Sequence, residues 1–172
     1  MRSRSGGTRR LLAVHVREAG PLDLDDVVAL RLALLRDDAA TPGRRPLHPD
    51  AERRARVLYA KQLRSPREVT LLAEREDTHA VVGIIRLALA PPSPFHADFR
   101  HAYLSSAYVV PEARRRGVLR SLVLHGLAWA EAHGAAEVRL HAAVGNAAAA
   151  IAWERLGFPA REVLRTRLIP PR

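Results

Sequence analysis

Cysteine is absent from this chain of 172 residues, and lysine occurs only once, as Lys61. Without cysteine the chain has no disulfide bond, no thiolate nucleophile and no cysteine-ligated zinc site. A Walker-type phosphate loop needs a lysine directly after a glycine, whereas Lys61 follows Ala60, so that class of nucleotide site is excluded.

Long apolar runs and aromatic side chains are also scarce. No apolar run approaches the roughly 18 residues of a membrane span, and the N-terminus lacks the apolar middle of a secretory signal. We therefore expect a cytoplasmic protein without a membrane partner. Aromatic residues make up only 5% of the chain, which is few for the stacking platform of a single-strand nucleic-acid binder.

Positive charge is plentiful, and nearly all of it comes from arginine. The formal net charge of +10 attracts polyanions, including nucleic acids, nucleotides and acidic proteins. The same excess can be a composition habit of an alanine- and arginine-rich proteome, so charge alone does not choose between these readings. With 48% hydrophobic residues, the chain can bury the core of one domain, which we place at residues 11–172. Residues 1–10 are small, polar and basic, and we expect a disordered tail there.

The periodicity of apolar residues predicts the order of the elements. Strands are expected over residues 11–17, 69–73, 80–89, 102–110, 137–142 and 162–168, and helices over 23–36, 50–64, 117–133 and 146–156. Asp23 and Asp50 stand where N-caps of the first two helices would be. This order describes an α/β domain with a mixed sheet.

The stretch from Tyr103 to Gly134 is the most informative part of the sequence. It reads as a strand, then a proline-led turn with three arginines that closes on Gly117, then an amphipathic helix. The first N–H groups of a helix lack intrahelical partners and sit at the positive end of its dipole, so such a terminus binds phosphate. Arg114, Arg115 and Arg116 add charge there, and a glycine lets the backbone approach a ligand closely.

These residues resemble the GNAT-type acyl-CoA N-acyltransferases. The main motif of that family is Arg or Gln, two residues, Gly, one residue, then Gly or Ala, and Arg114, Gly117 and Leu119 occupy those places. Asn146 and the run from Trp153 to Phe158 are similar to the family's second landmark, an Asn followed by Tyr-x-x-Leu-Gly-Phe. The resemblance implies a single-domain fold whose mixed, mostly antiparallel sheet has about six to seven strands, flanked by about four helices.

The resemblance also implies that acetyl-CoA is the co-substrate of transfer to a primary amine. The backbone from Tyr108 to Val110 would hydrogen-bond the pantetheine arm as an added strand does, and an N–H near Val110 would polarise the thioester carbonyl. The amides from Arg115 to Ser121 would hold the pyrophosphate, and Asn146 would reach the pantetheine. The implied cofactor-binding residues are Tyr108, Val109, Val110, Arg115, Arg116, Gly117, Val118, Leu119, Arg120, Ser121, Asn146 and Trp153.

Two departures from the family pattern bear on binding and mechanism. Leu119 replaces a small residue, so its side chain must turn toward the helix packing. Trp153 stands where many relatives have a tyrosine that protonates the departing thiolate, and an indole N–H does not transfer its proton near neutral pH. The thiolate either leaves unprotonated or takes a proton from water, or else a hydroxyl on the preceding strand supplies it. The candidate hydroxyls are those of Tyr103, Ser105 and Tyr108.

Deprotonation of the incoming amine needs a separate group, and His141 is the candidate. It lies five residues before Asn146, where some relatives that acetylate ribosomal proteins carry a glutamate base, and imidazole titrates near neutrality. The alternative is that His141 only packs beside its strand. His96, Asp98 and His101 fit no standard metal-site spacing, so no metal is expected.

Three functions remain open at this stage. The first is an acetyl-CoA-dependent N-acetyltransferase that works by direct attack in a ternary complex. The second is a CoA-binding sensor without chemistry, suggested by Trp153, and the third, suggested by charge alone, is a nucleic-acid-binding domain. The sequence does not identify the amine acceptor. A homodimer is common among similar proteins.

Overall fold

The computed structural model describes residues 10–39, 46–92, 95, 99–142, 145–163, 165 and 167. Among them the elements are β1 (Val14–Glu18), η1 (Pro21–Asp23), α1 (Leu24–Ala39), α2 (Ala51–Gln62), β2 (Glu68–Arg75), β3 (Val81–Leu89), β4 (His101–Val109), η2 (Pro111–Ala113), α3 (Val118–Ala132), β5 (Glu137–Arg139) and α4 (Ala147–Arg155). The contacts divide the chain into two compact units, residues 1–140 and 141–172, each considered by itself.

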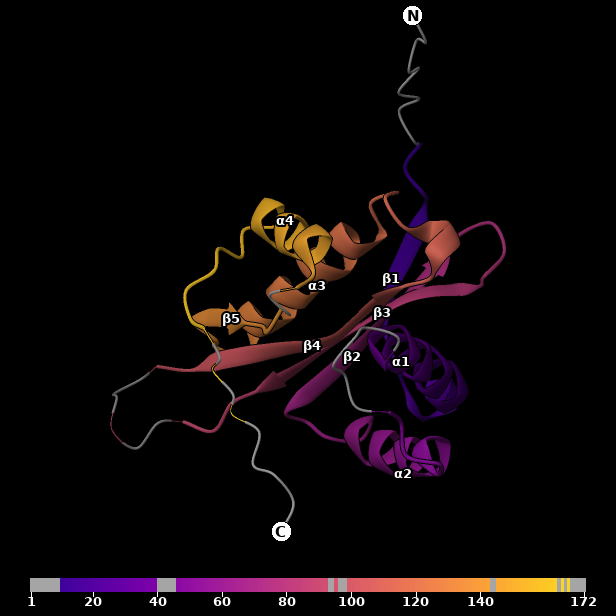
Figure 1. Cartoon of the computed structure of the whole chain (residues 1–172), viewed down its shortest axis with the longest axis horizontal. Helices are drawn as coiled ribbons and strands as arrows, with labels where there is room; N and C mark the ends of the chain where they lie inside the picture. The colour runs from indigo at the N-terminus through magenta and orange to yellow at the C-terminus, as the bar shows by residue number, and fades with distance from the viewer. Residues whose placement is uncertain are drawn as a thin grey trace, which may run out of the picture. The chain divides into compact units, whose positions relative to one another are not determined.

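The first unit is built on one mixed sheet with the strand order β1-β2-β3-β4-β5. The first three pairings are antiparallel, and β4 pairs with β5 in parallel. Figure 1 shows α1 and α2 on one face of this sheet and α3 on the other. The α/β class and the mixed, mostly antiparallel sheet predicted from the sequence are confirmed.

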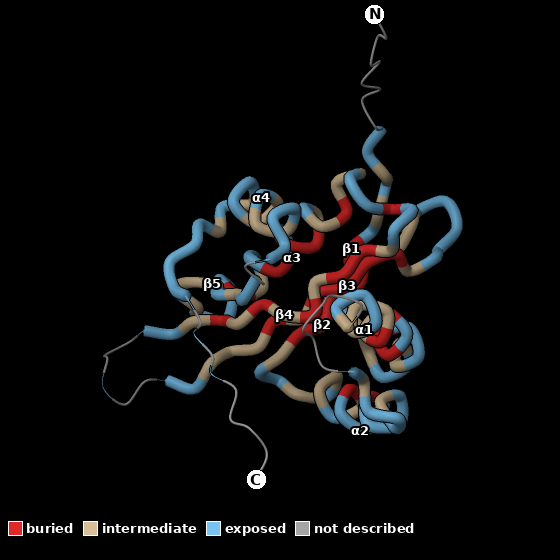
Figure 2. The backbone as a smooth tube through the Cα atoms, in the orientation of Figure 1, coloured by how far each residue is buried: buried red, intermediate tan, exposed pale blue. Residues whose placement is uncertain are grey.

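Apolar side chains on both faces of the central strands explain why the helices pack there. Leu72 and Ile84 point toward α1, where Val27 and Val28 cover them. On the other face Ile85 and Leu87 contact α3 so closely that a Cβ on Gly126 would lie 2.8 Å from a Leu87 methyl. Figure 2 shows the buried residues concentrated along β2, β3 and the helix faces that meet them.

The described residues form five strands, fewer than the six to seven predicted. Of the strand expected over 162–168, the described residues 162, 163, 165 and 167 lie outside regular structure, and the others lie outside the described residues. The four predicted helices are present within a few residues of their expected bounds. The expected basic tail lies outside the described residues except for Arg10.

In the structure, the two aspartates expected to cap helices use their carboxylates for other hydrogen bonds. Asp23 accepts the N–H of Gly20 at 2.7 Å and pairs with Arg17, so it closes the short η1 turn that precedes α1. Asp50 occupies the N-cap position of α2, but its carboxylate accepts from Arg53 at 2.8 Å and makes no cap hydrogen bond. Nearby arginines therefore compete with the helix amides for both carboxylates.

Candidate functional site

The edge of β4 opens where β5 diverges from it. The two strands pair over only three residues, from His101 to Tyr103, so within the described part of the chain the rest of β4 has no strand on that side. On the β3 side the register shifts between Ser105 and Tyr108, and Ser106 adopts a φ of 59°. This bulge bends β4 just before its open edge reaches the turn.

The N–H groups of the last β4 residues point to alternate sides. The N–H of Val110 donates to the carbonyl of Val82 in β3 at 3.0 Å. Because successive N–H groups of an extended strand face opposite edges, the N–H of Val109 faces the open edge. The carbonyl of Val109 accepts from Arg114 Nε at 2.8 Å. The backbone donor available near the end of β4 is thus that of Val109, since Val110 is used within the sheet.

Arg114 contacts protein groups on three sides. Besides the Val109 carbonyl, its guanidinium donates to Asp37 of α1 at 2.9 Å and lies 5.3 Å from the centre of the Tyr108 ring. The Tyr108 ring itself is 8% exposed and packs in the core under α1. Arg114 therefore links β4, the turn and α1, and its charge is shared with the Asp37 carboxylate.

The turn that follows has two residues with positive φ. Arg115 has a φ of 61° and Gly117, the N-cap of α3, has a φ of 87°. A Cβ on Gly117 would lie 3.0 Å from a methyl group of Leu11, because the chain before β1 crosses the turn at this point. Leu12 N–H donates to the Arg116 carbonyl at 3.0 Å, and Arg116 Nε donates to the Arg10 carbonyl at 3.3 Å. Arg116 is therefore partly engaged by the N-terminal segment.

The N-terminus of α3 presents unpaired amides. Its first intrahelical hydrogen bond runs from Ser121 N–H to the Gly117 carbonyl at 3.1 Å. The N–H groups of Val118, Leu119 and Arg120 precede this bond and so have no intrahelical acceptor. The Ser121 amide, expected among the pyrophosphate donors, is consumed by the helix itself. The Val118 side chain is buried at 1% exposure, whereas that of Leu119 is half-buried.

Two guanidinium groups remain exposed beside these amides. Arg115 and Arg120 make no ion pair or side-chain hydrogen bond within the described residues. Together with the three unpaired amides and the helix dipole, they form a positive terminus with room for an anion. An anion site at this terminus stays a prediction from the sequence, and the structure adds that Arg114 pairs with Asp37.

The second unit carries Asn146 at the N-cap of α4. Its side-chain Oδ1 accepts the N–H of Ala149 at 3.0 Å, so the oxygen holds the first turn of the helix. The Nδ2 group keeps its donors for another partner. Asn146 is therefore both a helix cap and a candidate donor.

The C-terminal end of α4 explains the second landmark in structural terms. Phe158 N–H donates to the Trp153 carbonyl and Gly157 N–H to the Glu154 carbonyl, with a φ of 88° at Gly157. This is a Schellman ending, in which apolar side chains at the two outer positions commonly touch. Here the Trp153 and Phe158 rings meet edge to face at 5.7 Å. Trp153 thus has a structural role that needs no proton transfer.

The remaining predicted site residues are His141 and the three candidate metal ligands. His141 lies exposed in the segment before α4, beyond the end of β5, and belongs to the second unit. Among the residues that the structure describes, no three His, Asp, Glu or Cys side chains gather as a metal site would require. His96 and Asp98 lie outside the described residues.

The sequence profile of the acetyltransferase (GNAT) family matches residues 32–158, which is more than half of the chain. The chain belongs to the GNAT acetyltransferase family. It is an N-acetyltransferase, and the matched range includes the strand, turn and helix from β4 to α3. No curated protein matches the GNAT chain by sequence.

Solved structures with the same fold are numerous. A predicted acetyltransferase with acetyl-CoA from Clostridium acetobutylicum is 18% identical, with a TM-score of 0.71 over 90% of this chain and 96% of that one. An aminoglycoside N-acetyltransferase in complex with CoA is 20% identical, with a TM-score of 0.69 over 95% and 98%. An aminoglycoside antibiotic 6'-N-acetyltransferase from Acinetobacter baumannii is 22% identical, with a TM-score of 0.70 over 92% and 100%. These likenesses establish the GNAT fold.

None of the helices in the described residues is long and apolar enough to cross a bilayer.

Proposed function

We propose that the protein transfers the acetyl group of acetyl-CoA to a primary amine by direct attack within a ternary complex. One observation carries this proposal: the open edge of β4 leads directly into a helix terminus with three unpaired amides. An extended amide-containing arm suits the strand edge, and a pyrophosphate suits the helix terminus. The presence of acetyl-CoA or CoA in two structures of the same fold supports the same ligand here.

Within the first unit, the cofactor is assigned to the end of β4 and the start of α3. The N–H of Val109 is the proposed donor to the acyl carbonyl, and the amides of Val118 to Arg120 hold the pyrophosphate with Arg115 beside them. Asn146 contributes its Nδ2 donors to the pantetheine arm. Since the Arg114 guanidinium already occupies the Val109 carbonyl, that carbonyl is not assigned to the cofactor.

The reaction requires that the amine lose one proton and that the CoA thiolate gain one. The amine nitrogen attacks the thioester carbon, the developing oxyanion accepts the Val109 N–H, and the carbon–sulfur bond breaks to release CoA thiolate. His141 takes the proton that the amine loses, as the base nominated from the sequence. The thiolate takes a proton from water, and the hydroxyl of Tyr108 is the alternative donor.

The deciding experiment mixes the protein with acetyl-CoA and a panel of primary amines and follows the release of free thiol. At least one amine is expected to release thiol in proportion to acetylated product identified by mass. Binding of CoA without turnover of any amine would contradict the proposal. That result would favour a CoA-binding module without chemistry, the function suggested by Trp153 at the position of the usual tyrosine.

A further inference from the structure

The bulge in β4 carries a serine in a backbone conformation that favours glycine. Ser106 has a φ of 59°, and residues 106 and 107 of β4 together oppose the single residue Ile85 of β3. A bulge of this form usually has glycine at its first position, because a left-handed φ is free of steric cost only without a Cβ. Ser106 therefore keeps its side chain at a conformational cost, which directs attention to what that side chain does.

The Ser106 side chain lies on the face of the sheet that α3 covers. Ile85, which opposes the bulge, packs against α3, and residues directly opposite each other in an antiparallel pair share a face. Val109, the proposed donor to the acyl carbonyl, lies on this face too. Its partner in β3 is Gly83, where an added Cβ would lie 3.1 Å from a Val118 methyl group of α3. Ser106 and Val109 thus share a face, three residues apart.

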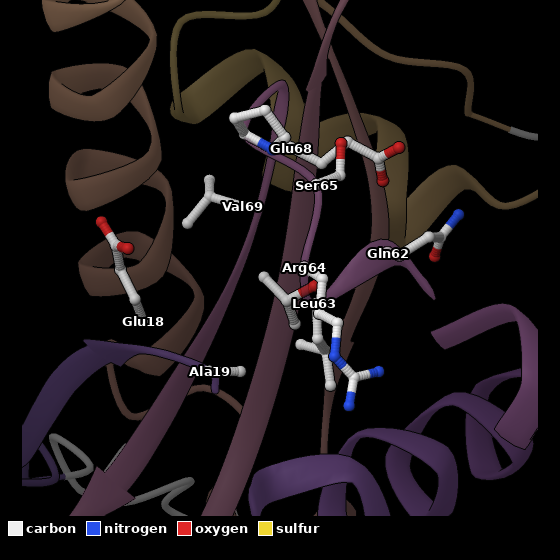
Figure 3. Close-up of a pocket in the computed structure, with 10 residues that line it drawn as sticks. Glu18, Ala19, Gln62, Leu63, Arg64, Ser65, Glu68 and Val69 are labelled. Atoms are coloured by element: carbon white, nitrogen blue, oxygen red, sulfur yellow. The ribbon is translucent and has the colours of Figure 1, made fainter. Parts of the chain in front are cut away.

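The Ser106 hydroxyl is nearly buried and has no hydrogen-bond partner. The residue is 9% exposed, and within the described part of the chain its side chain makes no hydrogen bond. It differs from Gln62, which Figure 3 shows in the wall of a separate hollow at the ends of β1 and α2. Gln62 Oε1 is the only side-chain oxygen or nitrogen of the described residues that is both unpaired and sealed from solvent. The Ser106 hydroxyl is therefore still accessible to solvent.

The order of the binding groups along the chain sets the direction of the acyl group. This step rests on the proposed function, in which the Val109 N–H binds the thioester carbonyl and the amides of Val118 to Arg120 bind the pyrophosphate. The pantetheine arm then approaches Val109 from the side of the turn, and the acyl chain continues past Val109 toward residues 107 and 106. Three residues of extended strand span about 10 Å, and the bulge shortens this span. An acetyl group therefore ends before Ser106, whereas a longer acyl chain reaches it.

We propose that Ser106 restricts the acyl donor to short acyl groups such as acetyl. A longer aliphatic chain covers the Ser106 hydroxyl with methylene groups and leaves it without water or another partner, which costs free energy. The Cβ also occupies room that a glycine in this bulge would leave open. Ser106 is thus a specificity-determining residue of the acyl site and takes no part in bond making.

The test measures transfer from acetyl-, butyryl- and hexanoyl-CoA to the amine that the thiol-release panel identifies. In the wild type, kcat/KM is expected to fall as the acyl chain lengthens. Ser106→Ala removes only the hydroxyl and is expected to raise the ratio of kcat/KM for hexanoyl-CoA to that for acetyl-CoA about tenfold, since an unmade hydrogen bond contributes about that factor. Ser106→Gly also removes the Cβ and suits the bulge, so its ratio should rise at least as much.

Thr70→Val is the matched control. It removes a buried hydroxyl from β2, two strands away from β4, and should leave the ratio unchanged. A wild type that transfers hexanoyl as fast as acetyl, or equal ratios in the wild type and both Ser106 variants, would overturn the inference. Acetyl transfer by the wild type would still support the proposed function in that case.

If no amine is acylated, calorimetry with the two thioesters decides. Hexanoyl-CoA that gains affinity relative to acetyl-CoA in Ser106→Ala, but not in Thr70→Val, supports the inference. An unchanged relative affinity, or no binding of either thioester to the wild type, contradicts it.

Discussion

Proton transfer is the step of the proposed reaction that depends most on single residues. A primary ammonium with a pKa near 10.4 is almost fully protonated at neutral pH, so a base must remove its proton before attack. His141, just beyond β5, is the residue proposed for this task, and its exposed position allows contact with an acceptor. Trp153 is fixed by the end of α4 and is not proposed as an acid.

Replacing His141 with Ala is expected to lower kcat/KM at neutral pH by about 100-fold, because a positioned base contributes roughly that factor. The ascending, acid-side limb of the pH-rate profile should move to higher pH, toward the pKa of the free amine. His133→Ala is the control, since His133 stacks on Trp129 at the far end of α3 from Gly117. A profile that is the same in His141→Ala and the wild type would remove His141 from the mechanism.

Some residue roles could be predicted from the sequence, and others depend on partners far along the chain. Gly117 and the amides after it follow from a glycine before an amphipathic helix, and the structure places them as expected. From the sequence, Arg114 is expected only to add charge beside the helix amides. Its actual partner, Asp37, is 77 residues away, and no local pattern reveals such a contact. The positive φ of Ser106 could not be predicted from the sequence either, because a serine within a strand does not indicate a bulge.

At the scale of elements, one ion-pair cluster fastens β1 to its neighbours. Arg17 donates two hydrogen bonds to Asp23 in η1, at 2.7 and 3.0 Å, and one to Glu74 of β2 at 3.0 Å. The hydrogen bonds from Arg17 hold the pKa of Asp23 below its ordinary value of 3.8. A carboxyl group with a lowered pKa stabilises the fold above its unfolded pKa, and this contribution is lost as pH falls through the folded pKa.

Arg17→Met is therefore expected to reduce the free energy of unfolding at pH 7 by about 1–3 kcal/mol, the range for hydrogen bonds to charged groups. The difference between variant and wild type should shrink as pH falls below 3.8, where Asp23 of the unfolded chain takes up a proton, and should vanish once pH has passed the lower pKa of Asp23 in the folded protein. Urea denaturation at neutral pH and in acid measures both values. Arg75→Met is the control. It breaks the ion pair between Arg75, the last residue of β2, and the exposed Asp77, and it should lower the free energy of unfolding by less. A difference that does not depend on pH would show that the charges of the cluster contribute nothing.

Helices and strands were predicted best where the apolar pattern extends over many residues. The helix from Val118 to Ala132 follows from its apolar face, and β3 follows from an almost continuous apolar run. The strand expected over 162–168 rested on a short alternation near the end of the chain, which does not distinguish a strand from an extended tail. Sheet order could not be read from local patterns, because it depends on pairing between distant residues.

At the scale of the whole molecule, the net charge of +10 favours an anionic ligand without specifying one. We propose that specificity for CoA comes from the start of α3. The unpaired amides of Val118 to Arg120 lie there beside the exposed Arg115 and Arg120. If this terminus binds the pyrophosphate of CoA, its geometry must matter more than the overall charge. Gly117 sets that geometry through a backbone conformation that other residues rarely adopt.

The most direct test of the proposed CoA site is calorimetric titration of CoA into the wild type, Gly117→Ala and Gly134→Ala. Both glycines have a positive φ, 87° and 73°, but a Cβ at Gly134 would meet no atom within 4 Å, so it controls for backbone strain alone. CoA is expected to bind the wild type and Gly134→Ala at sub-millimolar concentration, and to bind Gly117→Ala at least tenfold more weakly, because the added Cβ and the strained backbone displace the amides. No binding to the wild type, or equal binding to all three proteins, would contradict it.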